Sequence, residues 1–74
     1  MSKPSIATLR KRVRATREAT GWSIRELGRQ SGISNAQLSQ LEGGLSNNPT
    51  FGTVCAIAKA LDVSVGYLVG ETDG

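Results

Sequence analysis

Two amide side chains, Asn35 and Gln40, stand in a segment that is almost free of charge. The segment SGISNAQLSQLEGG, residues 31–44, has one ionisable side chain, Glu42, whereas the whole chain has nine Lys or Arg and six Asp or Glu. Asn and Gln donate to and accept from a single base edge, and they pair with N6 and N7 of adenine in the major groove of DNA. The methyl group of Ala36 suits a thymine methyl. These residue types predict readout of a DNA sequence.

Such readout requires the side chains to share the outer face of one helix. At 100° per residue, Leu38 and Leu41 fall on the inner side of a helix over this segment. The opposite side carries Asn35, Ala36, Ser39 and Gln40. Gln37 projects toward the inner side, which favours packing or a phosphate contact. Basic residues elsewhere must then hold the phosphates, because phosphate contacts supply affinity whereas base contacts supply sequence choice.

The flanking residues predict two short helices joined by a tight turn. Ser23 is a good N-cap, and Glu26 three residues later completes a capping box. This helix ends near Gly32, which supplies a positive φ, and Ser34 caps the next helix, which runs to about Leu41. A connection of about three residues is typical of a helix-turn-helix.

Three further helices are expected, so the fold class is all-α. Apolar residues at helical spacing predict a first helix over about 5–18. Hydroxyl caps and apolar stripes predict a helix over 50–61, broken at Asp62, and a short helix over 64–70. Trp22 and Phe51 are expected to anchor the core.

The composition indicates one small domain. A chain of 74 residues buries a thin core, so we expect 1–74 to form a single domain with its ordered part at about 5–70. No apolar stretch approaches the ~20 residues of a membrane span. Cys55 is the one cysteine, which excludes an internal disulfide, and we expect it to be an inert small hydrophobe. A cytoplasmic protein of bacterial or phage origin fits these features.

The net charge of +3 is unevenly distributed, because all nine bases lie in 1–59 and three of the six acids lie in 60–74. The basic end is expected to meet DNA phosphates. The candidates for these contacts are Lys3, Arg10, Lys11, Arg12, Arg14, Arg25 and Arg29. The run RKRVR, residues 10–14, has two interpretations, a solvated helix face or a phosphate-binding surface beside the helix-turn-helix.

From Leu9 to about Gly70 the chain resembles the lambda-repressor-like helix-turn-helix family, also called the Cro/cI-type or XRE family. The segments that carry the resemblance are R-x-x-x-G-W-S-I-R-E-L (17–27), SGISNAQLSQLEGG (31–44), N-P-T-F (48–51) and AIAKALDVSVGYLVG (56–70). Each segment alone is a weak signal, but together they are specific. The resemblance implies a compact five-helix DNA-binding domain with the helix-turn-helix at its second and third helices.

The resemblance also implies roles for individual positions. The base readers would be Ser34, Asn35, Ala36 and Gln40. Ser23 would bind a phosphate at a helix N-terminus, and Asn47, Asn48 and Thr50 would hold neighbouring phosphates. With Arg12, Arg25 and Gln37, these residues are the predicted contacts to the DNA backbone. Arg17 and Glu42 match a partly buried ion pair that joins the first and third helices of some related repressors.

Five positions leave alternatives open or depart from the family. On the last helix, Val65, Tyr67 and Val69 either pack inward or form a dimer contact. Many relatives have Gln where this chain has Ile24, so the DNA target cannot be transferred from a relative. Gly28 replaces the usual Ala, which allows the two helices to approach closely.

The function expected from the sequence is a transcriptional regulator, a repressor that binds a palindromic operator in the major groove as a homodimer. With no His and a single Cys, the chain offers no Ser/His pair, Cys/His pair or metal cluster, so we expect neither an enzyme nor a metal or other cofactor. The main alternative is an antitoxin or partner-binding module, in which a toxin or an effector domain contacts the acidic end. An accessory domain of a longer enzyme is the third possibility.

Overall fold

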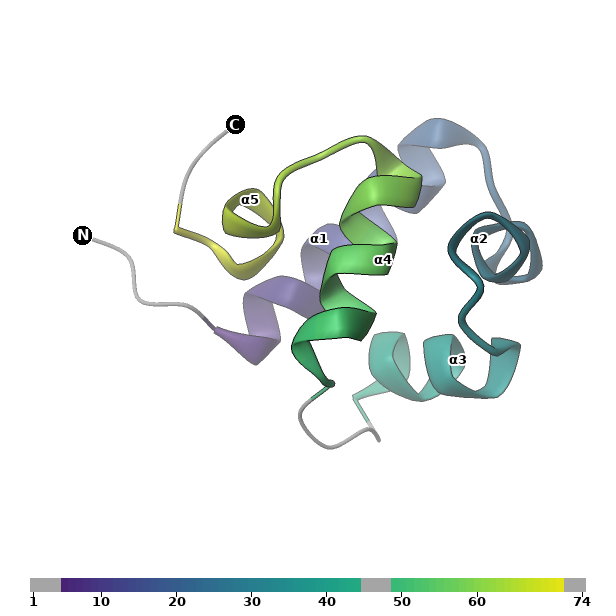
Figure 1. Cartoon of the computed structure of the whole chain (residues 1–74), viewed down its shortest axis with the longest axis horizontal. Coiled ribbons are helices and arrows are strands. Elements are labelled where there is room, and N and C mark those ends of the chain that lie inside the picture. Colours follow the sequence, from purple (N-terminus) through teal and green to yellow (C-terminus); the bar gives the residue numbers. More distant parts are fainter. Residues whose placement is uncertain (1–4, 45–48, 72–74) are drawn as a thin grey trace.

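The computed structural model describes residues 5–44 and 49–71, and these form five α-helices and no strand (Figure 1). The helices are α1 (Ile6–Thr20), α2 (Ile24–Ser31), α3 (Asn35–Gly43), α4 (Phe51–Leu61) and α5 (Val65–Val69). The predicted all-α class, and the helix-turn-helix at the second and third helices, are confirmed.

Every described helix begins after a hydroxyl side chain. The oxygen of this side chain accepts a hydrogen bond from the backbone N–H three residues later, which satisfies a donor that has no partner inside the helix. The caps are Ser5, Ser23, Ser34, Thr50 and Ser64. The capping box expected at α2 forms only on the Ser23 side, because the Glu26 carboxylate accepts instead from Gln30 Nε2 at 2.8 Å.

The first helix is longer at its C-terminal end than the expected 5–18. It continues to Thr20, whose hydroxyl donates to the Thr16 carbonyl at 2.8 Å. The chain then turns at Gly21, which has a φ of 84° that few other residues adopt. The backbone N–H of Trp22 donates to the Arg17 carbonyl at 3.1 Å and closes the end of the helix.

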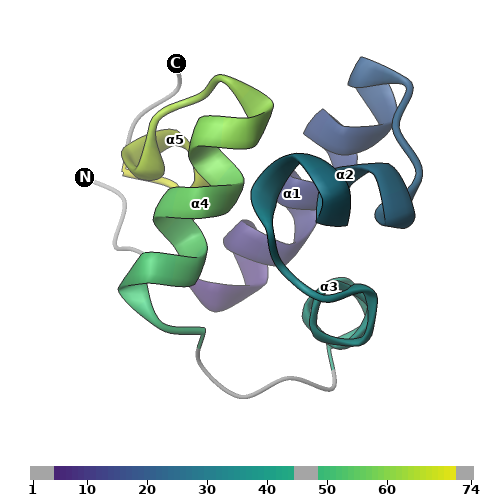
Figure 2. The same ribbon diagram turned by 45° about the vertical axis from the view of Figure 1, so that its right-hand side comes forward.

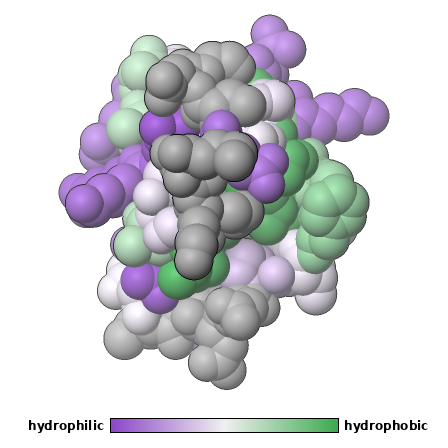
Figure 3. Space-filling view, turned by 90° about the vertical axis from the view of Figure 1, so that its left-hand side faces the viewer, coloured by the Kyte–Doolittle hydropathy of each residue, from purple (hydrophilic) through white to green (hydrophobic). Residues whose placement is uncertain are grey.

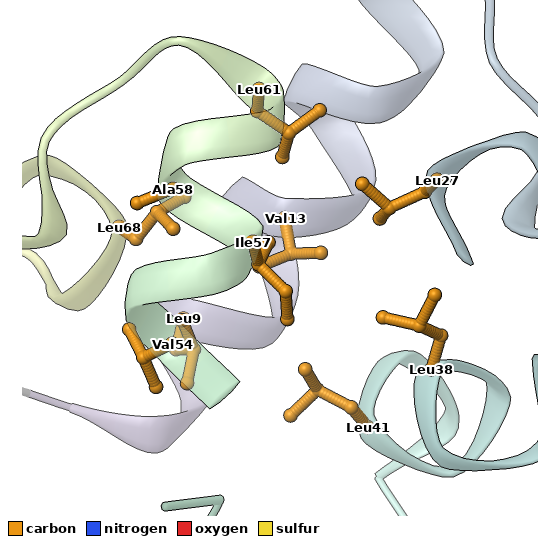
Figure 4. Close-up of a cluster of buried hydrophobic side chains, with 10 residues drawn as sticks. All are labelled: Leu9, Val13, Leu27, Leu38, Leu41, Val54, Ile57, Ala58, Leu61 and Leu68. Atoms are coloured by element: carbon orange, nitrogen blue, oxygen red, sulfur yellow. The ribbon is translucent and has the colours of Figure 1, made fainter. Parts of the chain in front are cut away.

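All five helices contribute to one apolar core (Figure 4). Side chains from α1, α2, α3 and α5 converge on the stripe of α4 that the sequence predicts. The buried hydrophobic residues are Leu9, Val13, Leu27, Leu38, Leu41, Val54, Ile57, Ala58, Leu61 and Leu68. A core that draws on every helix fixes α2 and α3 relative to each other.

Of the two aromatic residues expected to anchor the core, one packs against it and the other lies on the surface. Trp22 is half-buried and packs against the core. Phe51 is 75 % exposed, so its predicted place in the core is wrong. The reason is its position as the first residue of α4: Val54, one turn further along, already lies at the edge of the core with 6 % of its surface exposed.

The third helix lies at the margin of the domain. In Figure 2, α3 is seen nearly end-on, and α1, α2 and α4 all lie on the same side of it. On the opposite flank, α5 packs against α1 and α4 (Figure 1). Figure 3 looks at that flank and shows hydrophilic side chains projecting around an area of exposed hydrophobic surface. In the described part of the chain, no helix has the length and apolar character needed to cross a bilayer.

Candidate nucleic-acid interface

The inner and outer sides of α3 differ in burial as the sequence predicts. Leu38 is fully buried and Leu41 is 2 % exposed. The outer side consists of exposed neutral residues, which we call the α3 ridge: Asn35, Ala36, Ser39 and Gln40. Ser34, the cap of the helix, is also exposed. The ridge is held outward by the leucines beneath it and presents donors, acceptors and one methyl group without a charge.

The turn between α2 and α3 brings the two helices very close together. A Cβ atom added to Gly28 would lie 2.9 Å from the Ile33 carbonyl oxygen and 2.9 Å from Asn35 Oδ1. The expected close approach at Gly28 is therefore confirmed. Ser31 stabilises the turn, because its hydroxyl donates to the Leu27 carbonyl at 2.7 Å and accepts from the Ile33 N–H at 3.2 Å.

The ion pair implied by the family resemblance joins α1 to α3. Arg17 Nε lies 2.8 Å from Glu42 Oε2, and Arg17 Nη2 lies 2.9 Å from Oε1, so the contact is bidentate. The third guanidinium nitrogen donates to the Trp22 carbonyl at 2.7 Å. The side chains of Arg17 and Glu42 are 11 % and 6 % exposed. The hydrogen bond with Glu42 raises the pKa of Arg17 above its ordinary value, despite the opposing effect of burial.

Several predicted backbone contacts lie on the surface near the ends of α2, α3 and α4. Ser23 and Arg25 are exposed at the start of α2, and Thr50 is exposed at the start of α4. Gln37 is also exposed, so of its two alternatives the inward packing is wrong, and the phosphate contact stays a prediction. Asn47 and Asn48, like Lys3, lie outside the described residues.

Thr53 connects two of these sites, although the sequence analysis did not select it. Its hydroxyl oxygen lies 3.0 Å from the Thr50 hydroxyl oxygen and 3.5 Å from Gln37 Nε2. The polar surface therefore continues from the first turn of α3 to the first turn of α4. The three-residue spacing of Thr50 and Thr53 in a first helical turn is the signal that could have identified this contact.

Arg12 lies away from the other predicted backbone contacts. Its Nη1 donates to the Tyr67 carbonyl at 2.6 Å, and its guanidinium carbon lies 4.5 Å from the centre of the Tyr67 ring. These contacts join α1 to α5 and not to α2 or α3. The structure does not bring Arg12 together with the ridge, because its long side chain finds a carbonyl and an aromatic face on α5.

On α5, three residues for which the sequence leaves open either inward packing or a dimer contact are half-buried. Val65, Tyr67 and Val69 pack against the core from its surface, in agreement with the inward alternative, and a dimer contact stays a prediction. A hollow of about 660 Å³ lies beside Tyr67, between α1 and the connection from α4 to α5. It is the larger of two hollows described, and it does not adjoin the ridge.

Metal chemistry finds no support in the described residues, where no three His, Cys, Asp or Glu side chains gather into a possible metal site. Cys55 is a free, partly exposed cysteine beside the apolar stripe of α4.

Comparisons with known proteins identify the same segments. A family model described as helix-turn-helix matches residues 13–68. The transcriptional regulator SinR of Bacillus licheniformis is 34 % identical over 62 residues, which cover 84 % of this chain and 56 % of that protein. An uncharacterised HTH-type transcriptional regulator of Mycobacterium tuberculosis is 45 % identical over 56 residues, or 76 % of this chain and 39 % of that protein.

Two solved structures have the same fold. The N-terminal DNA-binding domain of SinR from Bacillus subtilis superposes with a TM-score of 0.78 at 32 % identity, covering 81 % of this chain and 87 % of that one. The P22 c2 repressor in complex with synthetic operator 9T gives a TM-score of 0.77 at 31 % identity, covering 86 % and 96 %. The chain spans about half the length, or less, of the curated relatives it matches. On these matches and on its five-helix fold, the chain belongs to the lambda-repressor-like helix-turn-helix family.

Proposed function

We propose that this chain is a sequence-specific DNA-binding transcriptional regulator, and that it acts as a repressor by occupying an operator. In this proposal α3 enters the major groove, and the α3 ridge reads base edges together with Ser34. Residues near the starts of α2 and α4 contact the flanking phosphates. The observation that carries the proposal is the exposed, uncharged ridge above the buried side chains of Leu38 and Leu41.

The chemistry of the ridge favours a nucleic acid over a protein partner. Amides can satisfy donors and acceptors of a base edge in a bidentate way, and a good bidentate pair discriminates by about 1–3 kcal/mol against the wrong base. A protein-binding surface would instead be expected to contain aromatic or other large apolar anchors at its centre. The relatives also support a nucleic-acid ligand, since they are named transcriptional regulators and one similar structure is a repressor with a bound operator.

A repressor of this size is proposed to bind as two copies. One α3 helix reads only a few base pairs, so two copies on half-sites about one helical turn apart would give useful affinity. The operator would then be palindromic. Val65, Tyr67 and Val69 remain the proposed dimer contact, because they are partly exposed on the surface of α5.

The experiment is selection from a random duplex library, followed by footprinting of the selected sites. We expect one enriched sequence with two-fold symmetry. Gln40→Ala should then weaken binding to the selected operator about 5- to 150-fold, which corresponds to ~1–3 kcal/mol, and should relax preference at one base pair.

Gln30→Ala is the matched control for Gln40→Ala. Gln30 is an exposed amide on α2, where it donates to Glu26 and is not part of the ridge. We expect this variant to bind like the unmodified protein. Enrichment of no sequence would contradict the proposed function, and an equal loss on operator and random DNA would contradict the reading role of Gln40.

Salt dependence separates DNA binding from the partner-binding alternative. Each neutralised phosphate contributes about −0.9 to the slope of log affinity against log salt concentration. The partner-binding alternative has support from one further similarity. A structure described as a complex of SinR with SinI protein matches 85 % of this chain and 61 % of that one, with a TM-score of 0.81 at 32 % identity. A flat salt response would favour a protein partner as the main ligand.

A further inference from the structure

A second hollow, of about 330 Å³, lies where the first half of α1 meets the end of α3. Arg10, Lys11 and Arg14 line it from α1, and Glu42, Gly43 and Gly44 line it from the C-terminal end of α3. We call the first three residues the α1 basic cluster. None of the three belongs to the predicted base-reading or ion-pair sets, and the two glycines leave part of the α3 wall without side chains.

The charge at this hollow is positive. The carboxylate of Glu42 is already held on both oxygens by Arg17, at 2.8 and 2.9 Å, so it does not neutralise the cluster. Arg14 lies 3.4 Å from Glu18, but both side chains are more than half exposed and an anion can displace such a contact readily. Arg10 Nε is buried and, among the described residues, has no hydrogen-bond partner.

The hollow adjoins the α3 ridge. From Ala36 to Gly43 is two helical turns, which place Gly43 on the same side of α3, about 10 Å further along the axis. This distance is close to the ~12 Å width of the major groove. A Cβ atom on Gly43 would meet nothing within 4 Å, whereas one on Gly44 would lie 3.7 Å from Arg10 Nη1. If the ridge lies in the major groove, the sugar–phosphate backbone that borders this groove would lie over the bare end of α3.

We propose, on the basis of the function proposed above, that the α1 basic cluster binds phosphates of the DNA strand that borders the groove entered by α3. The cluster supplies the cationic contacts on that side, where α3 has no basic residue in its last turn. Arg10 also faces the carbonyl end of α3 and stabilises it through the helix dipole. Lys11 and Arg14 are exposed and can meet phosphate oxygens, Arg14 in exchange for its surface contact with Glu18.

The test uses Lys11→Gln and Arg14→Gln, separately and together, because Gln keeps the helix propensity of the exposed positions. Lys59→Gln is the charge-matched control, because Lys59 is an exposed base in the last turn of α4. The first turn of α4 is the end that contacts α3, so Lys59 lies at the far end of that helix. Thermal unfolding of each variant verifies that the fold is retained.

Each single cluster variant should reduce the salt slope by about 0.9, and the pair by about twice that value. Affinity should fall by the same factor on the selected operator and on random DNA, because phosphate contacts carry no sequence information. Phosphate-ethylation interference should vanish at the flanking phosphates only in the double variant. Lys59→Gln should match the unmodified protein.

The outcomes separate this proposal from the one on which it rests. If the unmodified protein selects an operator but the double variant keeps its salt slope and interference pattern, the cluster is a solvated helix face and this inference fails alone. A change of base preference in the double variant would also overturn it. If the unmodified protein binds no DNA, both proposals fail.

Discussion

Removal of Glu42 is the most informative perturbation of this fold. Glu42→Ala leaves the Arg17 guanidinium in a site where its side chain is 11 % exposed, with the Trp22 carbonyl as its remaining hydrogen-bond acceptor among the described residues. Breaking a buried pair by removing one partner costs about 3–5 kcal/mol. A domain of this length has a total stability of roughly 4–11 kcal/mol. The variant should therefore lose about a quarter or more of its stability.

Thermal and urea unfolding measure this effect. At about 4–8 °C per kcal/mol for a domain of this size, the expected decrease in Tm is ~12 °C or more. Replacing both partners, as Arg17→Met with Glu42→Leu, removes the uncompensated charge. It leaves the Trp22 carbonyl without its donor, which costs ~1 kcal/mol. The double variant should thus be more stable than Glu42→Ala.

The exposed pair of Arg14 and Glu18 is the control. It is an i,i+4 pair on the surface of α1, so Glu18→Ala should change stability by about 0.5 kcal/mol or less. Two results would refute this expectation. One is a Tm of Glu42→Ala equal to that of the unmodified protein, and the other is a double apolar variant that is less stable than Glu42→Ala. The first would mean that the pair contributes nothing in solution.

Two further predictions concern packing. Gly28→Ala should lower stability by about 1–3 kcal/mol although Ala favours helix by ~1 kcal/mol, because the added methyl group would displace the Ile33 carbonyl; a higher urea midpoint would contradict this. Leu38→Ala should cost about 2–5 kcal/mol, whereas Phe51→Ala should stay within about 0.5 kcal/mol, since Leu38 is fully buried and Phe51 is 75 % exposed; equal losses in urea unfolding would contradict the assignment of Phe51 to the surface.

The sequence predicts the helices well because local chemistry sets their ends. A hydroxyl that can accept from the N–H three residues later fixes where a helix begins, and this geometry needs no information from distant parts of the chain. Two boundaries extend past their expected ends, because α1 continues to Thr20 and α3 to Gly43, and each of these helices ends at a glycine in the left-handed region. The end of α1 depends on Gly21 and on a hydrogen bond within the helix at Thr20, both of which are readable nearby.

The predictions that failed all depended on distant contacts. Phe51 continues the apolar stripe of α4 by spacing, but the core ends one turn before it is reached. Gln37 projects inward on a helical wheel, yet its side chain lies on the surface beside Thr53. The contacts of Arg12 also come from a distant element, because its guanidinium meets Tyr67 of α5, and its role as a phosphate contact stays a prediction. Helical periodicity predicts on which face of a helix a residue lies, but it does not predict which part of the chain packs against that face.

The inward orientation of Glu42 both forms the ion pair with Arg17 and keeps negative charge off the surface of α3. Segment 31–44 has a single acid, Glu42, and this acid is turned inward to Arg17, so the surface that α3 presents has no negative charge of its own. An exposed carboxylate there would repel phosphates at the place where the α1 basic cluster is proposed to attract them. The same contact holds α3 against α1 and so fixes the ridge relative to the cluster. Under the proposed function, Glu42 therefore links stability to DNA recognition. A stable double apolar variant that binds DNA normally would show that packing alone can hold the ridge in position.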